Sequence, residues 1–128
     1  MLVVNRFEVT EGAEAQFDED ARQALNALSR CSGFLRGRCG ASVDEPQWRV
    51  LVTEWESVGA YRRALSAFDV KMYATPLLAR AIPETSAFEV TLSAEEDAIE
   101  EYSRDRASGD GQHERETAVD DRRTNRMS

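Results

Sequence analysis

Histidine and lysine are almost absent from this sequence, and cysteine is scarce. The 128 residues include a single histidine, His113, and two cysteines, Cys31 and Cys39. The cysteines form no CxxC pair and have no histidine nearby, so we expect no metal site and no secreted disulfide scaffold. Because no histidine precedes His113, the main part of the chain also lacks the commonest general base near neutral pH.

Long apolar runs and an excess of positive charge are missing as well. No stretch approaches the roughly 20 apolar residues of a membrane-spanning helix, and the opening MLVVNRFEV lacks the basic segment of a signal peptide. The formal net charge is -8, so the overall field of the protein repels nucleic-acid phosphates. These absences predict a cytoplasmic protein with no nucleic-acid or membrane partner.

The composition of the chain changes after Leu92. Residues 93–128 hold 11 acidic and 6 basic residues and few apolar ones, which are too few to offset the entropy of ordering the segment. The sequence therefore predicts a folded domain over residues 1–92 and an acidic, largely disordered tail over residues 93–128. The first part of this tail, residues 94–106, has the composition of a short polar helix.

The folded part is predicted to contain six elements in the order β-α-β-β-α-β. Apolar residues at helical spacing predict a helix over residues 13–29. Ser57 is a natural N-cap for a second helical region, which Pro76 kinks or restarts. Strands are predicted over residues 2–9, 34–42, 48–55 and 87–92. This order is typical of an α+β, ferredoxin-like antiparallel sheet with the helices on one face.

Both faces of the predicted sheet carry apolar side chains. In the first strand, Val3, Asn5 and Phe7 share one face, while the opposite face is half apolar and half charged. The third strand is mixed in the same way. Because one layer of helices cannot cover both faces, we expect a homodimer whose sheets pack face to face as a dimeric α/β barrel.

Several segments resemble the antibiotic biosynthesis monooxygenase (ABM) domain of the dimeric α/β barrel superfamily. They span residues 2–92 and are VVNRFEV, EGAEAQFDEDA, SGFLRG, VLVTEWESVGAYRRAL and FEVTL. That family includes cofactor-independent oxygenases of polyketide phenols and anthrones, and also heme-degrading monooxygenases. The resemblance implies a small monooxygenase that acts on an aromatic or polyketide-like molecule without a metal or other cofactor.

Two alternative functions remain open at this point. Asn5 matches the position of an asparagine that the heme-degrading branch needs, but that branch has a tryptophan where this chain has Ala64. It also has a heme-ligating histidine where residues 70–74 contain none, which leaves Tyr73 as the one side chain there able to act as an axial ligand. Heme binding or degradation would thus require an altered ligand. A non-catalytic dimeric binding or accessory module is the other alternative, because a fold does not determine a function.

The candidate site residues each have a structural alternative. Asn5 is predicted to hold a substrate oxyanion, although it could instead bond a neighbouring backbone group within the core. Tyr73 is predicted to hydrogen-bond the substrate or to relay a proton. The candidate substrate-binding residues are apolar or aromatic, with plain packing as the alternative for each; they are Phe17, Trp55, Tyr61, Phe68 and Met72.

Overall fold

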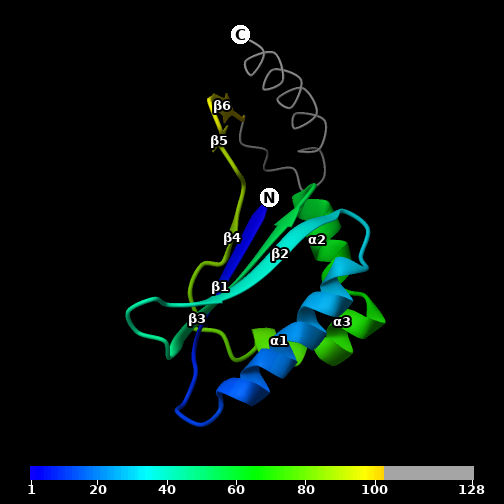
Figure 1. The fold of residues 1–128 in the computed structure, drawn as a ribbon. Helices are drawn as coiled ribbons and strands as arrows, with labels where there is room; N and C mark the ends of the chain where they lie inside the picture. Colours follow the sequence, from blue (N-terminus) through cyan, green and yellow to red (C-terminus); the bar gives the residue numbers. More distant parts are fainter. Residues whose placement is uncertain (103–128) are drawn as a thin grey trace.

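The computed structural model describes residues 1–102, and these form a four-stranded antiparallel sheet with the helices on one of its faces (Figure 1). In spatial order the strands of this sheet are β2 (Phe34–Ala41), β3 (Trp48–Trp55), β1 (Leu2–Glu8) and β4 (Ala87–Phe88). The predicted α+β, ferredoxin-like fold is confirmed.

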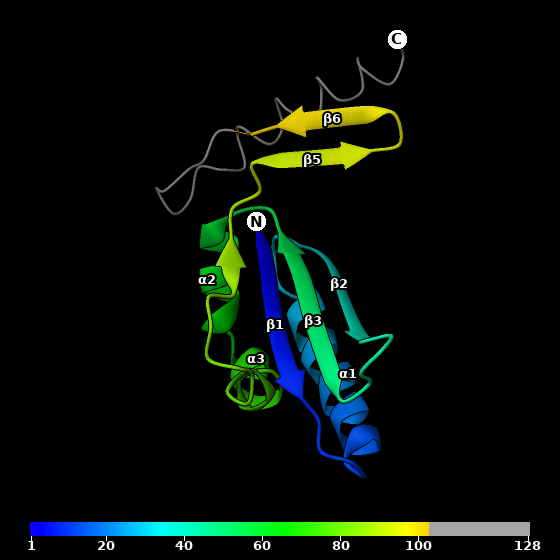
Figure 2. The same ribbon diagram turned by 90° about the vertical axis from the view of Figure 1, so that its left-hand side faces the viewer.

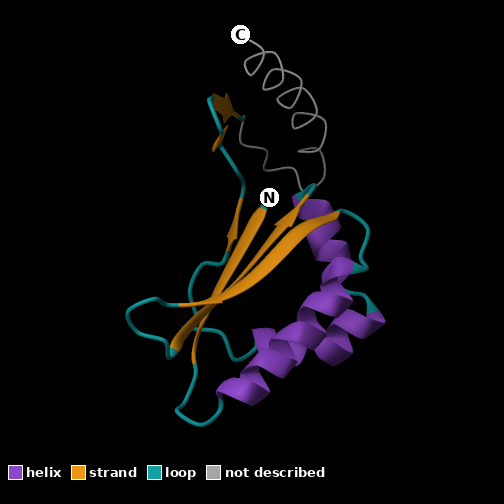
Figure 3. Cartoon of the chain, in the orientation of Figure 1, coloured by secondary structure: helices purple, strands orange, loops and turns teal. Residues whose placement is uncertain are grey.

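The helices follow the boundaries that local sequence signals indicate (Figure 3). They are α1 (Glu14–Ser29), α2 (Val58–Leu65), α3 (Phe68–Tyr73) and α4 (Thr75–Leu78). The Ser57 hydroxyl caps α2 by accepting a hydrogen bond of 3.0 Å from the N–H of Ala60, as predicted. Pro76 lies in the first turn of α4, where its missing N–H breaks no helical bond, so it restarts the helical region.

Alternation along the central strands determines which side chains enter the core. Val3 and Phe7 of β1 are each 2% exposed, and Leu51 and Trp55 of β3 are 1% and 0% exposed. Full burial of one such side chain contributes about 1.5–3 kcal/mol. α1 covers this face with a stripe of buried residues at helical spacing, namely Phe17, Ala21, Ala24 and Leu28.

No described helix covers the opposite face of the sheet, which we call the open face (Figure 2). The side chains on the open face alternate with the core residues along each strand, and the apolar ones among them are half-buried or exposed. They include Leu2, Val4, Trp48, Val50, Val52 and Phe88. The predicted mixture of apolar and charged residues on this face is therefore present in the structure.

The region after β4 differs from the prediction. The expected strand over residues 87–92 contracts to Ala87–Phe88, and the helix expected from residue 94 is wrong for the described part. In its place, β5 (Leu92–Glu95) and β6 (Ala98–Glu101) form a separate hairpin. Asp97 adopts a φ of 64° in the two-residue turn, a conformation that aspartate tolerates better than most residues. The rest of the predicted tail lies outside the described residues.

Candidate functional site

Asn5 lies in the middle of β1 on the face that the helices cover. Its neighbours on that face, Val3 and Phe7, are buried, whereas Asn5 itself is half-buried. Its side-chain amide makes no hydrogen bond with any residue in the described part of the chain, and its atoms keep some access to solvent. Asn5 therefore does not bond a neighbouring backbone group, and its amide donors are free to bind another molecule.

The strand register shows which residues lie beside Asn5 across the sheet. Leu51 pairs with Asn5 on one side and with Cys39 on the other, so the three side chains form one row on the helix-facing side. In the next row, Arg49 pairs with Phe7. The sheet thus brings an amide, a thiol and a guanidinium to one otherwise apolar face.

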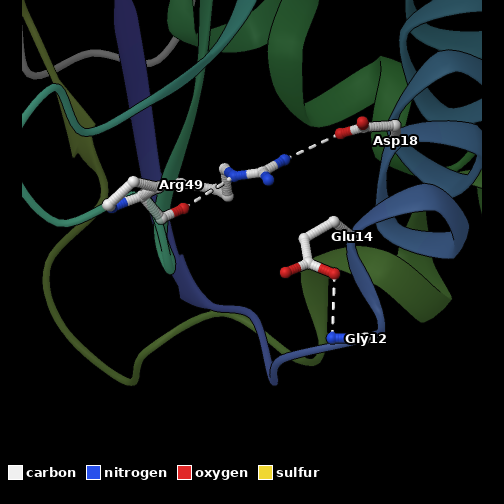
Figure 4. A network of polar contacts seen from close by, with 5 residues as sticks. Gly12, Glu14, Asp18 and Arg49 are labelled. Atoms are coloured by element: carbon white, nitrogen blue, oxygen red, sulfur yellow. Dashed lines mark hydrogen bonds and ion pairs between the residues drawn. The ribbon is translucent and has the colours of Figure 1, made fainter.

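Arg49 is held in place from several directions (Figure 4). Its Nη1 donates a hydrogen bond of 2.8 Å to Oδ1 of Asp18 on α1, and its Nε donates to the Pro46 carbonyl at 3.1 Å. Its Cζ lies 5.7 Å from the centroid of the Phe17 ring, a cation–π distance. The Arg49 side chain is only 12% exposed while Asp18 is 58% exposed. A permanent positive charge is therefore fixed under α1.

A separate polar contact holds the start of α1. The Glu14 carboxylate accepts a hydrogen bond of 2.9 Å from the N–H of Gly12 (Figure 4). A carboxylate in the first turn also interacts favourably with the positive end of the helix dipole. These contacts compensate for Ala13, which offers no side-chain cap to the helix.

An open groove of about 400 Å³ lies between α1 and strands β2 and β3. Its volume falls in the range of small-molecule sites, about 300–1,000 Å³. The residues lining this α1–β2 groove are Asp18, Ala21, Arg22, Leu25, Cys39, Gly40, Ala41 and Arg49. None of the seven residues that the sequence singled out is among them, and Leu51 separates Asn5 from its wall.

Cys39 lines the groove but is a poor nucleophile. Partial desolvation and the Asp18 carboxylate raise the pKa of its thiol, and the positive charge of Arg49 opposes this only in part. The thiolate, which is the reactive form, is therefore a minor species near neutral pH. Cys39 contributes a weakly polar wall to the groove.

Three of the predicted substrate-binding residues belong to the aromatic core. Phe17 is 1% exposed and lies edge-on to Phe7, with ring centroids 5.2 Å apart. Trp55 is fully buried, and its indole N–H donates to the Thr53 hydroxyl at 2.9 Å. The ring of half-buried Tyr61 lies 5.5 Å from that of Trp55, and burial raises the pKa of its phenol.

The other predicted residues lie on the outer surface of α3. Phe68, Met72 and Tyr73 are 74%, 52% and 50% exposed, while Val70 and Ala74 point inward. These three side chains are therefore exposed on α3 and are not part of the aromatic core. Of the two predicted catalytic residues, Asn5 faces the helices and Tyr73 is half exposed on a different element.

Residues 1–102 contain no group of three or more histidine, cysteine, aspartate or glutamate side chains that could hold a metal ion. Ala64, at the position of the heme-branch tryptophan, is buried in the core, and His113 lies outside the described residues. Residues 1–102 therefore lack both the tryptophan and the histidine of the heme-degrading branch, and Tyr73 stays the one candidate axial ligand among them. Within this part of the chain, no helix is long and apolar enough to cross a membrane.

Arg49 and the α1–β2 groove are the features that sequence reasoning missed. One signal was available, because Arg49 alternates with Leu51, Thr53 and Trp55 on one face of the third strand. An arginine in that pattern indicates a charge directed toward the core side. Its partner Asp18 could not be identified, because the pair depends on how α1 crosses the sheet.

Comparison with known proteins finds one matching family and several solved structures with a similar fold. The family model described as antibiotic biosynthesis monooxygenase matches residues 1–74. SnoaB from Streptomyces nogalater, a cofactor-independent oxygenase, is 31% identical; the match covers 67% of this chain and 84% of SnoaB, with a TM-score of 0.55. A conserved protein from Methanosarcina mazei Go1 shares the fold at 15% identity and a TM-score of 0.56, over 67% of this chain and 84% of that one. No curated protein matches the chain.

Proposed function

The chain belongs to the antibiotic biosynthesis monooxygenase family, and from this premise we propose that it oxygenates an electron-rich aromatic or polyketide-like molecule without a metal or other cofactor. The similarity to SnoaB supports the cofactor-independent form of the reaction. The absence of a recognisable metal-ligand cluster in residues 1–102 is compatible with it.

The proposed chemistry uses the substrate as its own reductant. A substrate with an acidic ring CH₂ group loses a proton, and the resulting carbanion combines with O₂ to form a carbon-bound peroxide. The peroxide takes up a proton and loses water, which leaves a carbonyl group on the ring. One oxygen atom enters the product and the other leaves as water, and the substrate supplies all the electrons. The protein must therefore stabilise an anion in a site that admits O₂.

The single observation that carries the residue assignment is the unpartnered amide of Asn5 on an otherwise buried apolar face. An amide donor fixed in such surroundings stabilises a developing oxyanion more strongly than water does, because it needs no reorganisation. We assign Asn5 this role toward the substrate oxygen. Arg49, one register row away, adds a positive potential that favours the anionic substrate.

Tyr73 is the second residue of the proposal. It is half exposed, so its phenol can exchange protons with solvent while it contacts a ligand seated beside α3. Phe68 and Met72 on the same helix would provide an apolar surface for that ligand. Tyr73→Phe should lower turnover with little change in stability, because the lost hydroxyl is not buried.

We also propose that the protein is a homodimer formed through the open face. The observation behind it is the set of half-buried and exposed apolar side chains on that face, including Val50, Val52 and Phe88. Apolar surface of this kind normally marks an interface. Light scattering on the purified protein tests it, and a monomeric mass at micromolar concentration would refute it.

A non-catalytic binding module is favoured by one specific observation. Residues 1–102 contain no histidine, so the most common proton acceptor near neutral pH is missing from the described site. The same fold and groove would then serve to bind an aromatic molecule without transforming it. Oxygen consumption distinguishes the two functions, because only the oxygenase consumes O₂ in proportion to the substrate added.

The test of the proposed function is oxygen uptake with a panel of anthrones and electron-rich phenols. With a substrate that the wild type turns over, Asn5→Ala should lower the rate on the order of 100-fold and leave the melting temperature nearly unchanged. Asn26→Ala is the matched control, since Asn26 is an exposed asparagine on α1. Unchanged turnover in Asn5→Ala would remove Asn5 from the site, and failure of the whole panel would favour the binding module.

A further inference from the structure

The α1–β2 groove is separate from the residues that carry the proposed oxygenase chemistry. Neither Asn5 nor Tyr73 lines it, and Leu51 lies between Asn5 and the Cys39 wall. α1 forms one side of the groove, and β2, at the edge of the sheet, forms the other. Because the groove opens to solvent at this edge, it can hold a molecule that never enters the Asn5 site.

Small side chains keep the space between α1 and β2 open. Ala21 lines the helix wall, and Cys39 and Ala41 line the strand wall; these side chains are too short to fill the gap. Leu25 closes one end, because a Cβ on Gly37 of β2 would lie only 2.7 Å from the Cδ2 atom of Leu25. The middle of the groove and this end are therefore lined mainly by apolar atoms.

The other end of the groove is polar. Asp18 lies two turns before Leu25, about 10 Å along α1, and accepts the 2.8 Å hydrogen bond from Nη1 of Arg49. The Nε of Arg49 is also occupied, by the Pro46 carbonyl. Its Nη2 has no hydrogen-bond partner among residues 1–102 and is not sealed from solvent. A buried, fixed guanidinium with unused N–H donors thus lines this end.

The charges at the polar end favour an anion. Arg22, one turn after Asp18 on α1, also lines the groove, so two guanidinium groups stand there against one carboxylate. The burial of Arg49 weakens the screening of its charge by salt. Cys39 adds no opposing charge, because partial burial and the Asp18 carboxylate raise the pKa of its thiol. This end is therefore locally positive on a chain whose net charge is -8.

A carboxylate attached to an apolar body matches both ends of the groove. Its two oxygens suit the planar donors of an arginine, and the apolar walls beyond Arg49 leave no donors for the remaining oxygens of a phosphate. We propose that the α1–β2 groove binds a small carboxylic acid with a flat apolar body. The carboxylate bonds Nη2 of Arg49, and the apolar body lies over Ala21 and Cys39 toward Leu25. A volume of about 400 Å³ accommodates one or two rings. This site does not depend on the oxygenase reaction.

The test uses 2-naphthoate as the probe and the thiol of Cys39 as the reporter. Iodoacetamide alkylates both cysteines at about pH 8.5, where part of each thiol is ionised, and mass spectrometry follows each one separately. Cys31 is the internal reference, because it does not line the groove. A probe of this size should bind with a dissociation constant of about 1 mM. At roughly ten times that concentration, alkylation of Cys39 should slow about tenfold while the Cys31 rate stays unchanged.

The neutral isostere 2-naphthylmethanol tests the need for the carboxylate in the wild-type protein. It should slow Cys39 alkylation less than about twofold, because it lacks the charge that Arg49 binds. Absence of protection by 2-naphthoate, or equal protection by the alcohol, would overturn the proposal. This comparison needs no variant, so it holds even if a substitution of Arg49 disturbs the fold.

Three variants locate the bound probe. Arg49→Met should raise the naphthoate concentration needed for protection about tenfold. Arg38→Met is the matched control, since it removes the same charge from β2 but Arg38 pairs with Val52 and does not line the groove; it should change that concentration less than about twofold. Asn5→Ala should be protected like the wild type. Equal effects of Arg38→Met and Arg49→Met would overturn the site. Loss of protection in Asn5→Ala would also overturn it, by placing the probe at Asn5, and would leave the oxygenase proposal standing.

Discussion

Gly33 offers a direct test of the packing between the loop before β2 and the helix α2. It precedes β2 with a φ of +89°, and a Cβ at this position would lie 2.4 Å from the Cβ of Ala60 on α2. Its carbonyl accepts a hydrogen bond of 2.8 Å from the N–H of Glu56. This close approach sets the distance between the α1–β2 loop and the beginning of α2, directly beside the buried Trp55.

Gly12 is a natural control for Gly33. Its φ is +92°, almost the same, but a Cβ there would meet no atom within 4 Å. Gly12→Ala should therefore cost only the left-handed backbone strain, about 1–2 kcal/mol. Gly33→Ala should cost that strain plus roughly 1–3 kcal/mol for overpacking against Ala60, since the backbone of α2 must shift to relieve the contact.

Urea denaturation of the wild type and both variants measures the difference. The free energy of unfolding should fall clearly further for Gly33→Ala than for Gly12→Ala, with unchanged m-values. A double variant, Gly33→Ala with Ala60→Gly, should recover much of the excess loss, less the roughly 1 kcal/mol that glycine costs inside a helix. Equal losses in the two single variants would show that the contact with Ala60 does not constrain the fold.

Two other expectations concern charged groups. Arg49→Met should lower the free energy of unfolding by about 1–2 kcal/mol, because it removes the ion pair with Asp18 and the cation–π contact with Phe17. Arg22→Met is the control; its side chain is 76% exposed, and it should cost less than about 0.5 kcal/mol. Equal costs in urea denaturation would contradict the fixed position of Arg49. The hydrogen bond and charge of Arg6 lower the pKa of Glu84 below its ordinary value, so the stability this pair contributes should be present at neutral pH and lost as the pH falls through that lowered pKa. The difference between wild type and Glu84→Gln in urea melts should therefore vanish in acid, and a difference that persists at pH 2 would refute the assignment.

The sequence was sufficient to predict the sheet because its signals are local. Alternation in the first strand placed Val3, Asn5 and Phe7 on one face, and in the structure these three side chains share the helix-facing side of β1. The Ser57 cap and the restart at Pro76 were equally local, since each depends on a few neighbouring residues. Such features survive folding when tertiary packing agrees with the local preference.

The β5–β6 hairpin escaped prediction because propensity and pairing disagree there. Alanine and glutamate favour helices, and they dominate residues 94–101. The pairing of Ala94 with Ile99 across a turn at Asp97 outweighs that preference. The composition of a short segment therefore indicated the wrong element, although the alternation from Leu92 to Glu95 was visible.

The site was harder to predict than the fold. Asn5 was recognisable as a polar residue on an apolar face, and its free amide is consistent with the role assigned to it, which stays a prediction. The contact of Arg49 with Asp18 joins residues 31 positions apart, so it follows from the crossing of α1 over the sheet and not from any local pattern. The exposure of Tyr73 likewise depends on which side of α3 meets α1.

The two tryptophans of the chain sit on opposite faces of the same strand, and this gives the protein two independent optical reporters. Trp55 is fully enclosed, so its fluorescence should be blue-shifted and shielded from acrylamide for as long as the core is intact. Trp48 lies half-buried on the open face, with the Arg6 Cζ 5.9 Å from its ring centroid. Its emission should respond to whatever covers that face. In Trp48→Phe the remaining signal of Trp55 would report unfolding. In Trp55→Phe the remaining signal of Trp48 would report assembly.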